Sequence, residues 1–182
     1  TQHTEEFYDF YKNKMIFLDA KPNKAHLKLA EMEQAGKLSA IVTQNIDGLH
    51  QAAGSKNVFE LHGSVHRNYC QKCGKFFDVN YVVNAKGVPY CDECGGIIKP
   101  DVVLYEEGLD SQTINGAVRA ISKADMLIIG GTSLVVYPAA GMIDYFKGKY
   151  LAVLNRDATS RDKQADLCIT DPIGEVLGRI RV

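Results

Sequence analysis

Two pairs of cysteines constrain the fold of this chain more than any other feature. Cys70 and Cys73 form one Cys-x-x-Cys pair, Cys91 and Cys94 form a second, and residues 74–90 lie between them. Two intervening residues let a tight turn aim both thiolates at one ion, and two such turns supply the four ligands of a closed tetrahedral site. The pattern therefore predicts a small module stapled by a metal.

A closed four-sulfur site leaves no position for water, so we expect this metal to be structural and not catalytic. Tetrahedral sulfur sites suit zinc and iron alike, and the spacing does not choose between them. We favour zinc. Cys168 stands in the apolar run 167–169 and is expected to be a buried core residue.

The charge and hydropathy of the chain limit the classes of partner that it is expected to bind. The 21 basic and 22 acidic residues leave a formal net charge of −1, which provides no bulk attraction to nucleic acid or to an anionic membrane. No apolar run approaches the roughly 20 residues of a membrane span. Paired reduced cysteines are typical of the cytoplasm, where we expect the protein to reside.

Apolar runs and helical repeats alternate along the chain outside the cysteine segment. Strands are predicted at 37–43, 58–62, 102–105, 126–129, 150–154 and 167–170, and helices from Thr4, at 22–36, 111–124, 138–146 and 173–182. This alternation predicts an α/β fold, a doubly wound parallel sheet of Rossmann-like type. We expect residues 1–65 and 100–182 to form that domain, with residues 66–99 as a small metal-binding insert.

Polar residues that could take part in catalysis or binding follow the first two predicted strands. Ligands of open α/β sheets bind at the carboxyl ends of the strands. His62 ends one strand, is followed by Gly63, and is a candidate base beside the polar loop that holds Asn45 and Asp47. Asp47 also fits an ordinary Asp-Gly turn.

The loop after the strand at 126–129 is rich in glycine and hydroxyls. Gly131 permits close backbone approach, and Thr132 and Ser133 can reach a phosphate or a ribose. Asn155, at another strand end, suits a ribose hydroxyl. Each signal alone also fits a plain turn.

Together these motifs resemble the sirtuins, which are NAD-dependent protein lysine deacylases, and the bacterial branch is the most similar. The resemblance lies in TQNIDGLH at 43–50, ELHG at 60–63, the two cysteine pairs, KPDVV at 99–103 and GTSLVVYPAA at 131–140. The motifs stand in the family's order and cover essentially the whole chain. The resemblance implies a nucleotide-binding sheet with a small zinc module, and a cleft that takes NAD and an acyl-lysine peptide.

The resemblance also implies the reaction. The acyl oxygen of the lysine attacks the nicotinamide ribose, nicotinamide leaves, and His62 as general base helps a ribose hydroxyl attack the resulting imidate. The products are free lysine, nicotinamide and an O-acyl-ADP-ribose. Asn45 is the second catalytic position, near the ribose.

Further site roles follow from the matched motifs. The implied NAD contacts are Gln44, Asn45, Ile46, Asp47, His62, Gly131, Thr132, Ser133, Asn155, Arg156 and Ile173. Val103 and Tyr105 stand where the family pairs its sheet edge with the substrate peptide. The four paired cysteines match the zinc ligands.

Two departures from the family pattern are visible. The family begins with a glycine-rich phosphate-binding loop and a Pro-Asp-Phe-Arg-type segment, and neither occurs between Thr1 and Val182. We therefore expect the printed chain to be incomplete on its N-terminal side and inactive by itself. Second, the chain has Tyr105-Glu106-Glu107 where many sirtuins have Phe-Gly-Glu, which leaves the loop conformation open.

Three other functions compete with this interpretation. A zinc ribbon for nucleic acid is disfavoured because segment 66–99 holds only five basic residues against three acidic ones. An electron-transfer protein with iron in the four-cysteine site would be coloured. The third alternative is a member of the same family that binds NAD as a regulator without catalysing the reaction.

Overall fold

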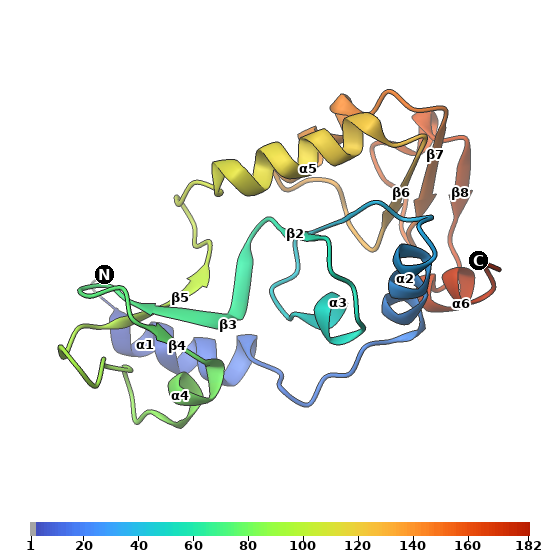
Figure 1. Cartoon of the computed structure of the whole chain (residues 1–182). Coiled ribbons are helices and arrows are strands. Elements are labelled where there is room, and N and C mark those ends of the chain that lie inside the picture. Colours follow the sequence, from blue (N-terminus) through green and yellow to red (C-terminus); the bar gives the residue numbers. More distant parts are fainter. Residues whose placement is uncertain (1–2) are drawn as a thin grey trace. The chain divides into compact units, whose positions relative to one another are not determined.

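A computed structural model describes residues 3–182, which divide into two compact units (Figure 1). The cysteine unit contains the chain up to Ala20, Asn45–Gly48 and His62–Gly108. The sheet unit contains Lys21–Gln44, Leu49–Leu61 and Leu109–Val182. The predicted insert of residues 66–99 lies inside the cysteine unit, which extends beyond it.

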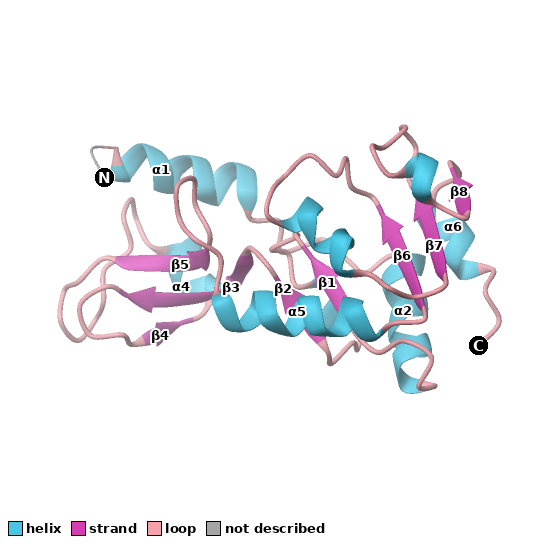
Figure 2. Ribbon diagram, turned by 90° about the horizontal axis from the view of Figure 1, so that it is seen from above, coloured by secondary structure: helices cyan, strands magenta, loops and turns pink. Residues whose placement is uncertain are grey.

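Parallel strands build the sheet unit (Figure 2). Strands β6 (Met126–Gly130), β7 (Tyr150–Leu154) and β8 (Leu167–Ile169) pair in that order, and β1 (Ile41–Thr43) pairs with β2 (Val58–Glu60). The prediction of parallel strands alternating with helices is confirmed. The strand predicted over 37–43 is shorter in the structure.

Strand β7 shows why the sheet is buried on both faces. Its alternate residues point to opposite sides. Ala152 and Leu154 pack with helices α2 (Lys24–Gln34) and α6 (Ile173–Gly178), whereas Leu151 and Val153 join a second cluster. A strand covered on both sides reads as a continuous apolar run, as in this sequence.

Local sequence signals set the helix ends in the sheet unit. The Asn23 side chain accepts hydrogen bonds from the backbone N–H groups of Ala25 and His26, and α2 stops before Gly36, which has φ 69°. Helix α3 (Leu49–Ala52) is short, and Asp110 caps α5 (Ser111–Lys123).

Three expectations for the sheet unit were wrong in detail. The helix expected over 138–146 is a 3-10 helix, η2 (Ala139–Tyr145), and the one expected over 173–182 ends at Gly178. The third is Cys168, which is exposed and not buried, because it lies on the outer strand β8. Another 3-10 helix, η3, for which no prediction was made, covers Asp162–Gln164.

An antiparallel sheet forms the centre of the cysteine unit. Strand β3 (Gly63–Cys70) lies between β4 (Phe76–Phe77) and β5 (Ile98–Val102) in the sheet. In sequence, helix α4 (Val79–Asn84) stands between β4 and β5. The strand expected over 102–105 instead ends at Val102, because Leu104 enters a turn closed by its hydrogen bond from the N–H of Glu107.

The first helix is part of the core of the cysteine unit. Helix α1 (Thr4–Phe10) continues into a π-helix, η1 (Tyr11–Met15). Tyr8 and Tyr11 are buried together with Val82 and Ile98, and the Tyr8 hydroxyl donates to the Ile98 carbonyl. Burial raises the pKa of Tyr8 to about 12. The cysteine module therefore shares one core with a helix far away in the sequence.

Lys12 fastens the same helix to the loop after α4. Its Nζ donates to the carbonyl oxygens of Ala85 and Gly87, each at 2.6 Å. Desolvation lowers the pKa of Lys12. Among residues 3–182, no helix has both the length and the apolar character needed to cross a membrane.

Candidate active site and metal centre

The four paired cysteines converge on one point. The sulfur of Cys70 lies 3.4 Å from that of Cys94, and the sulfur of Cys73 lies 3.7 Å from that of Cys91. All four sulfurs lie within 4.8 Å of one another. A tetrahedral zinc with bonds of about 2.3 Å needs sulfurs about 3.8 Å apart, so the cluster fits a zinc ion.

Glycines shape the two turns that present the sulfurs. The N–H of Gly74 donates to the Cys70 carbonyl at 2.9 Å, and the N–H of Gly95 donates to the Cys91 carbonyl at 3.0 Å. Both glycines have φ near +70°, at 74° and 67°. A Cβ on Gly96 would stand 2.8 Å from the Cys70 sulfur. The sulfurs thus occupy the space that a side chain at position 96 would fill.

The thiols are not equivalent. The backbone N–H groups of Cys73 and Lys72 lower the pKa of Cys70 to about 6. The Lys75 N–H also lowers the pKa of Cys73, but its sulfur contacts with Cys94 and Cys70 outweigh this and raise it to about 12. The raised pKa of Cys73 shows that the four sulfurs do not all ionise together by themselves, and a bound cation would allow all four to be thiolates, which is the chemistry of a structural zinc site.

Lys75 connects the two cysteine turns. Its Nζ lies 2.8 Å from a carboxylate oxygen of Asp92 and 2.8 Å from one of Glu93, both between the second pair of cysteines. The two carboxylates raise the pKa of Lys75, and Lys75 lowers the pKa of Asp92. The ion pairs link the turns across the sequence.

Two strand-end loops meet in the sheet unit. Gln44 follows β1, and its Nε2 donates to the Thr132 hydroxyl at 3.4 Å. That hydroxyl also accepts the N–H of Leu134 at 3.2 Å. Gly131 has φ 61°, and apart from its own chain neighbours no described residue has an atom within 4 Å of the place of a Cβ. A ligand can therefore approach this backbone closely.

The other predicted residues of the sheet unit lie at the same strand ends. Gly130 is paired with Leu154, so Asn155 directly follows the neighbouring strand. A Cβ on Gly130 would stand 2.4 Å from Cδ1 of Ile173, which places Ile173 against this loop. Asn155 Nδ2 donates to the Asp157 carbonyl at 2.9 Å, while Ser133 is exposed.

His62 lies where the cysteine unit forces a close backbone contact. Its carbonyl accepts the N–H of Val103 at 3.1 Å. The next residue, Gly63, has φ 76°, and a Cβ there would stand 1.9 Å from the Asp101 carbonyl oxygen. His62 itself is half-buried. The glycine that follows the histidine is thus required by the pairing of β3 with β5.

The loop Asn45–Gly48 also belongs to the cysteine unit. The Ile46 carbonyl accepts the N–H of Val65 at 3.0 Å. Sequence reasoning missed a second contact, in which His66 Nε2 lies 3.0 Å from the Asp47 carbonyl. Its only sequence signal is a histidine on the strand that begins after His62.

The turn after β5 explains one departure from the family pattern. Glu106 has φ 70°, the left-handed conformation that a glycine adopts without strain. The Glu107 carboxylate accepts the N–H of Leu104 and pairs with Lys99, each at 3.0 Å. The turn therefore forms without the glycine. Val103 precedes it, and Tyr105 is fully exposed within it.

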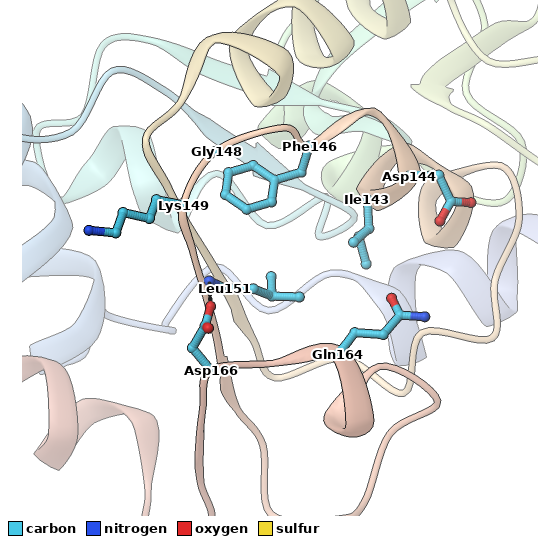
Figure 3. Close-up of a pocket in the computed structure, with 8 residues that line it drawn as sticks. All are labelled: Ile143, Asp144, Phe146, Gly148, Lys149, Leu151, Gln164 and Asp166. Atoms are coloured by element: carbon cyan, nitrogen blue, oxygen red, sulfur yellow. Dashed lines mark hydrogen bonds between the residues drawn. The ribbon is translucent and has the colours of Figure 1, made fainter.

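A hollow of about 460 Å³ lies elsewhere in the sheet unit (Figure 3). It is lined by Ile143, Asp144, Phe146, Gly148, Lys149, Leu151, Gln164 and Asp166. Arg161 pairs with Asp144 at 2.7 Å, and Asp166 accepts the N–H of Leu151 at 2.8 Å. Because its carboxylates already have protein partners, this hollow is not assigned to the chemistry.

Comparison with known proteins places these features in a wider group. The sequence model of the Sir2 family matches residues 1–138. The chain is 66% identical over 176 residues to an NAD-dependent protein deacetylase of Clostridium acetobutylicum, covering 96% of this chain and 72% of that protein.

Solved structures give the same result. One is a complex of Sir2 with a p53 peptide and NAD+, with a TM-score of 0.89 and 41% identity over 98% of this chain and 77% of that one. Another holds Sir2 with an inhibitor, 2'-O-acetyl-ADP-ribose and a deacetylated p53 peptide, with a TM-score of 0.89 and 42% identity over 98% and 79% of the two chains.

Proposed function

This chain belongs to the Sir2 family, and from that premise we propose that it removes acetyl groups from protein lysines in an NAD-dependent reaction. One water is consumed to release the lysine amine, and the products are the free lysine, nicotinamide and O-acetyl-ADP-ribose. The 66% identity to the clostridial NAD-dependent protein deacetylase carries the proposal. The complexes of similar structures with NAD+, a peptide and the acetylated nucleotide product support it.

His62 is proposed as the general base. Imidazole accepts and returns a proton at neutral pH better than any other side chain. The close approach of Gly63 to Asp101 and the hydrogen bond from the Val103 N–H to the His62 carbonyl hold the backbone at His62 in place. His62 takes the proton of a ribose hydroxyl of the co-substrate, and Asn45 orients the same ribose.

Substrate binding is divided by residue type. We assign the nicotinamide end of NAD to Ile46 and Asp47. The adenosine end is assigned to residues with small or polar side chains at strand ends: Gln44, Gly131, Thr132, Ser133, Asn155, Arg156 and Ile173. The meeting of Gln44 with Thr132 and of Ile173 with Gly130 supports this assignment.

The acyl-lysine peptide is assigned to the edge of β5. This strand is an outer strand in the order β4-β3-β5, so a peptide can add to it by backbone hydrogen bonds. Val103 and Tyr105 follow the strand and would contact the peptide. Backbone pairing reads little side-chain sequence, which suits several protein substrates.

Zinc has a structural role in this proposal. The ligands are Cys70, Cys73, Cys91 and Cys94, and a site with four protein sulfurs has no position left for a reacting water. The ion holds the two cysteine turns together and takes no part in the chemistry. We place the protein in the cytoplasm, where thiolates stay reduced, and immunofluorescence or fractionation tests that assignment.

Mass spectrometry of an acetyl-lysine peptide incubated with the full protein, with and without NAD, tests the function. We expect NAD-dependent loss of the acetyl group together with O-acetyl-ADP-ribose. The substitution His62→Ala should lower the rate by about 10²–10⁴-fold, the usual contribution of a general base. His3→Ala, at an exposed histidine, is the matched control.

Two results would contradict parts of the proposal. Equal rates for His62→Ala and the unchanged protein would remove His62 as the base. A lack of turnover on acetyl, succinyl and fatty-acyl peptides, with NAD binding retained in calorimetry, would identify a binding protein instead of an enzyme.

A further inference from the structure

The loop Asn45–Gly48 is held against β3 at two successive carbonyl groups. The Val65 N–H donates to the Ile46 carbonyl at 3.0 Å, and this contact between backbone groups is compatible with any side chain. The next carbonyl, that of Asp47, meets the ring of His66 at 3.0 Å. This second contact depends on the residue at position 66.

The chemistry of the pair fixes the direction of the hydrogen bond. A carbonyl oxygen only accepts, so Nε2 of His66 must carry the proton and donate it. The bond therefore sets the orientation of the peptide plane between Asp47 and Gly48. The N–H of His66 in turn donates to the Ser64 hydroxyl at 3.2 Å, a contact within β3.

Gly48 gives an independent sign of the same contact. It has φ 69°, and a Cβ built on it would stand 2.7 Å from Cδ2 and 2.9 Å from Nε2 of His66. The imidazole thus lies directly against the backbone of Gly48. The ring packs where any larger residue at position 48 would have to stand.

We propose that His66 is a positioning residue for NAD, holding the loop that presents Asn45, Ile46 and Asp47. The inference rests on the proposed function, because that function assigns these three residues to the nicotinamide ribose and the carboxamide. His66 touches the loop and not the reacting atoms. Its effect is therefore on how well the nicotinamide end binds.

Three substitutions separate the hydrogen bond from the packing. His66→Gln keeps an N–H donor, His66→Phe keeps a ring against Gly48 without a donor, and His66→Ala removes both. Tyr69→Ala, at an exposed position on the same strand, is the control. KM for NAD, KM for the peptide, kcat and the inhibition constant of nicotinamide are measured for each variant of the full protein.

Loss of one hydrogen bond predicts a threefold to tenfold increase in KM for NAD and in the nicotinamide inhibition constant for His66→Ala. KM for the peptide and kcat should change less than twofold, and His66→Gln should recover most of the loss. A purely structural defect would instead lower kcat through a smaller active fraction. NAD and nicotinamide constants within twofold of the unchanged protein would overturn the proposal.

Hydrogen exchange gives a readout that does not need turnover. The peptide covering residues 44–49 should exchange faster in His66→Ala than in His66→Gln, with residues 150–154 unchanged. An unchanged exchange rate in 44–49 would refute the contact. If the unmodified protein itself fails to deacetylate, the proposed function fails, while this exchange comparison still decides whether His66 holds the loop Asn45–Gly48.

Discussion

The cysteine unit and the sheet unit hold their functional loops by different means. In the sheet unit, alternate residues of β7 lie in two apolar clusters, and the functional loops directly follow such strands. The cysteine unit relies on four sulfurs, on glycines with positive φ and on charged cross-links such as Lys75 with Asp92. The comparison teaches that the sheet unit fixes its loops mainly by burial, whereas the cysteine unit adds cross-links to a buried core of its own.

Removal of the metal should separate the two units most strongly. A zinc chelator, or Cys73→Ser, should unfold the cysteine unit, because structural zinc contributes folding free energy directly. Hydrogen exchange should rise across residues 63–102 and remain slow across 150–154. Equal protection in both regions after verified metal loss would break the comparison.

The reverse experiment creates a cavity in the core of the sheet unit. Leu154→Ala should lower the free energy of unfolding by about 2–5 kcal/mol, since Leu154 is buried in the cluster with Ala152 and Leu177. Zinc content should stay at one ion per chain. Denaturant unfolding measures the loss, and Leu27→Ala, at a position 53% exposed, should change stability by about 0.5 kcal/mol or less.

Alanine substitutions at two glycines of the cysteine unit separate the cost of backbone strain from the cost of steric overlap. Gly63→Ala faces both a φ of 76° and a Cβ 1.9 Å from the Asp101 carbonyl, and should destabilise by about 3 kcal/mol. Gly74→Ala has a similar φ of 74°, but apart from its chain neighbours its Cβ would meet no described residue within 4 Å, so a loss of about 1 kcal/mol is expected. Equal losses on urea titration would mean that backbone strain alone decides.

The smallest effect is expected at the turn after β5. Glu106→Gly should stabilise the protein by about 0.5–1 kcal/mol, because glycine removes the cost of the left-handed φ but adds chain entropy. Glu106→Ala keeps a Cβ and should show no such gain. A loss of stability in thermal unfolding of the glycine variant would show that the Glu106 side chain contributes more than its strain costs.

Local signals were sufficient where one residue decides one feature. Helix α2 lies within the predicted range 22–36, where Asn23 caps its start and Gly36 follows its end; the run at 150–154 is strand β7, and the cysteine spacing predicted the convergence of the sulfurs. Each of these depends on neighbours in the sequence or on a fixed spacing. The fold class followed from the alternation of such elements.

Long-range packing was not readable from the sequence. The contact of Tyr8 with Ile98 joins residues 90 positions apart, and the aromatic run 7–11 gives no sign of its partner. Cys168 lies in an apolar run but on an outer strand, so its exposure depends on strand order. The contact of His66 with Asp47 likewise arises only when β3 meets the loop.

The sharing of one core by α1 and β5 has a consequence for synthesis of the protein. A ribosome adds about 5–20 residues per second, so about 5–20 seconds pass between the emergence of α1 and the emergence of Ile98, 90 residues later. During that interval Tyr8 and Tyr11 face water or a chaperone. The cysteine unit is thus completed only once β5 has left the exit tunnel, and the supply of zinc to the nascent chain matters from that point on.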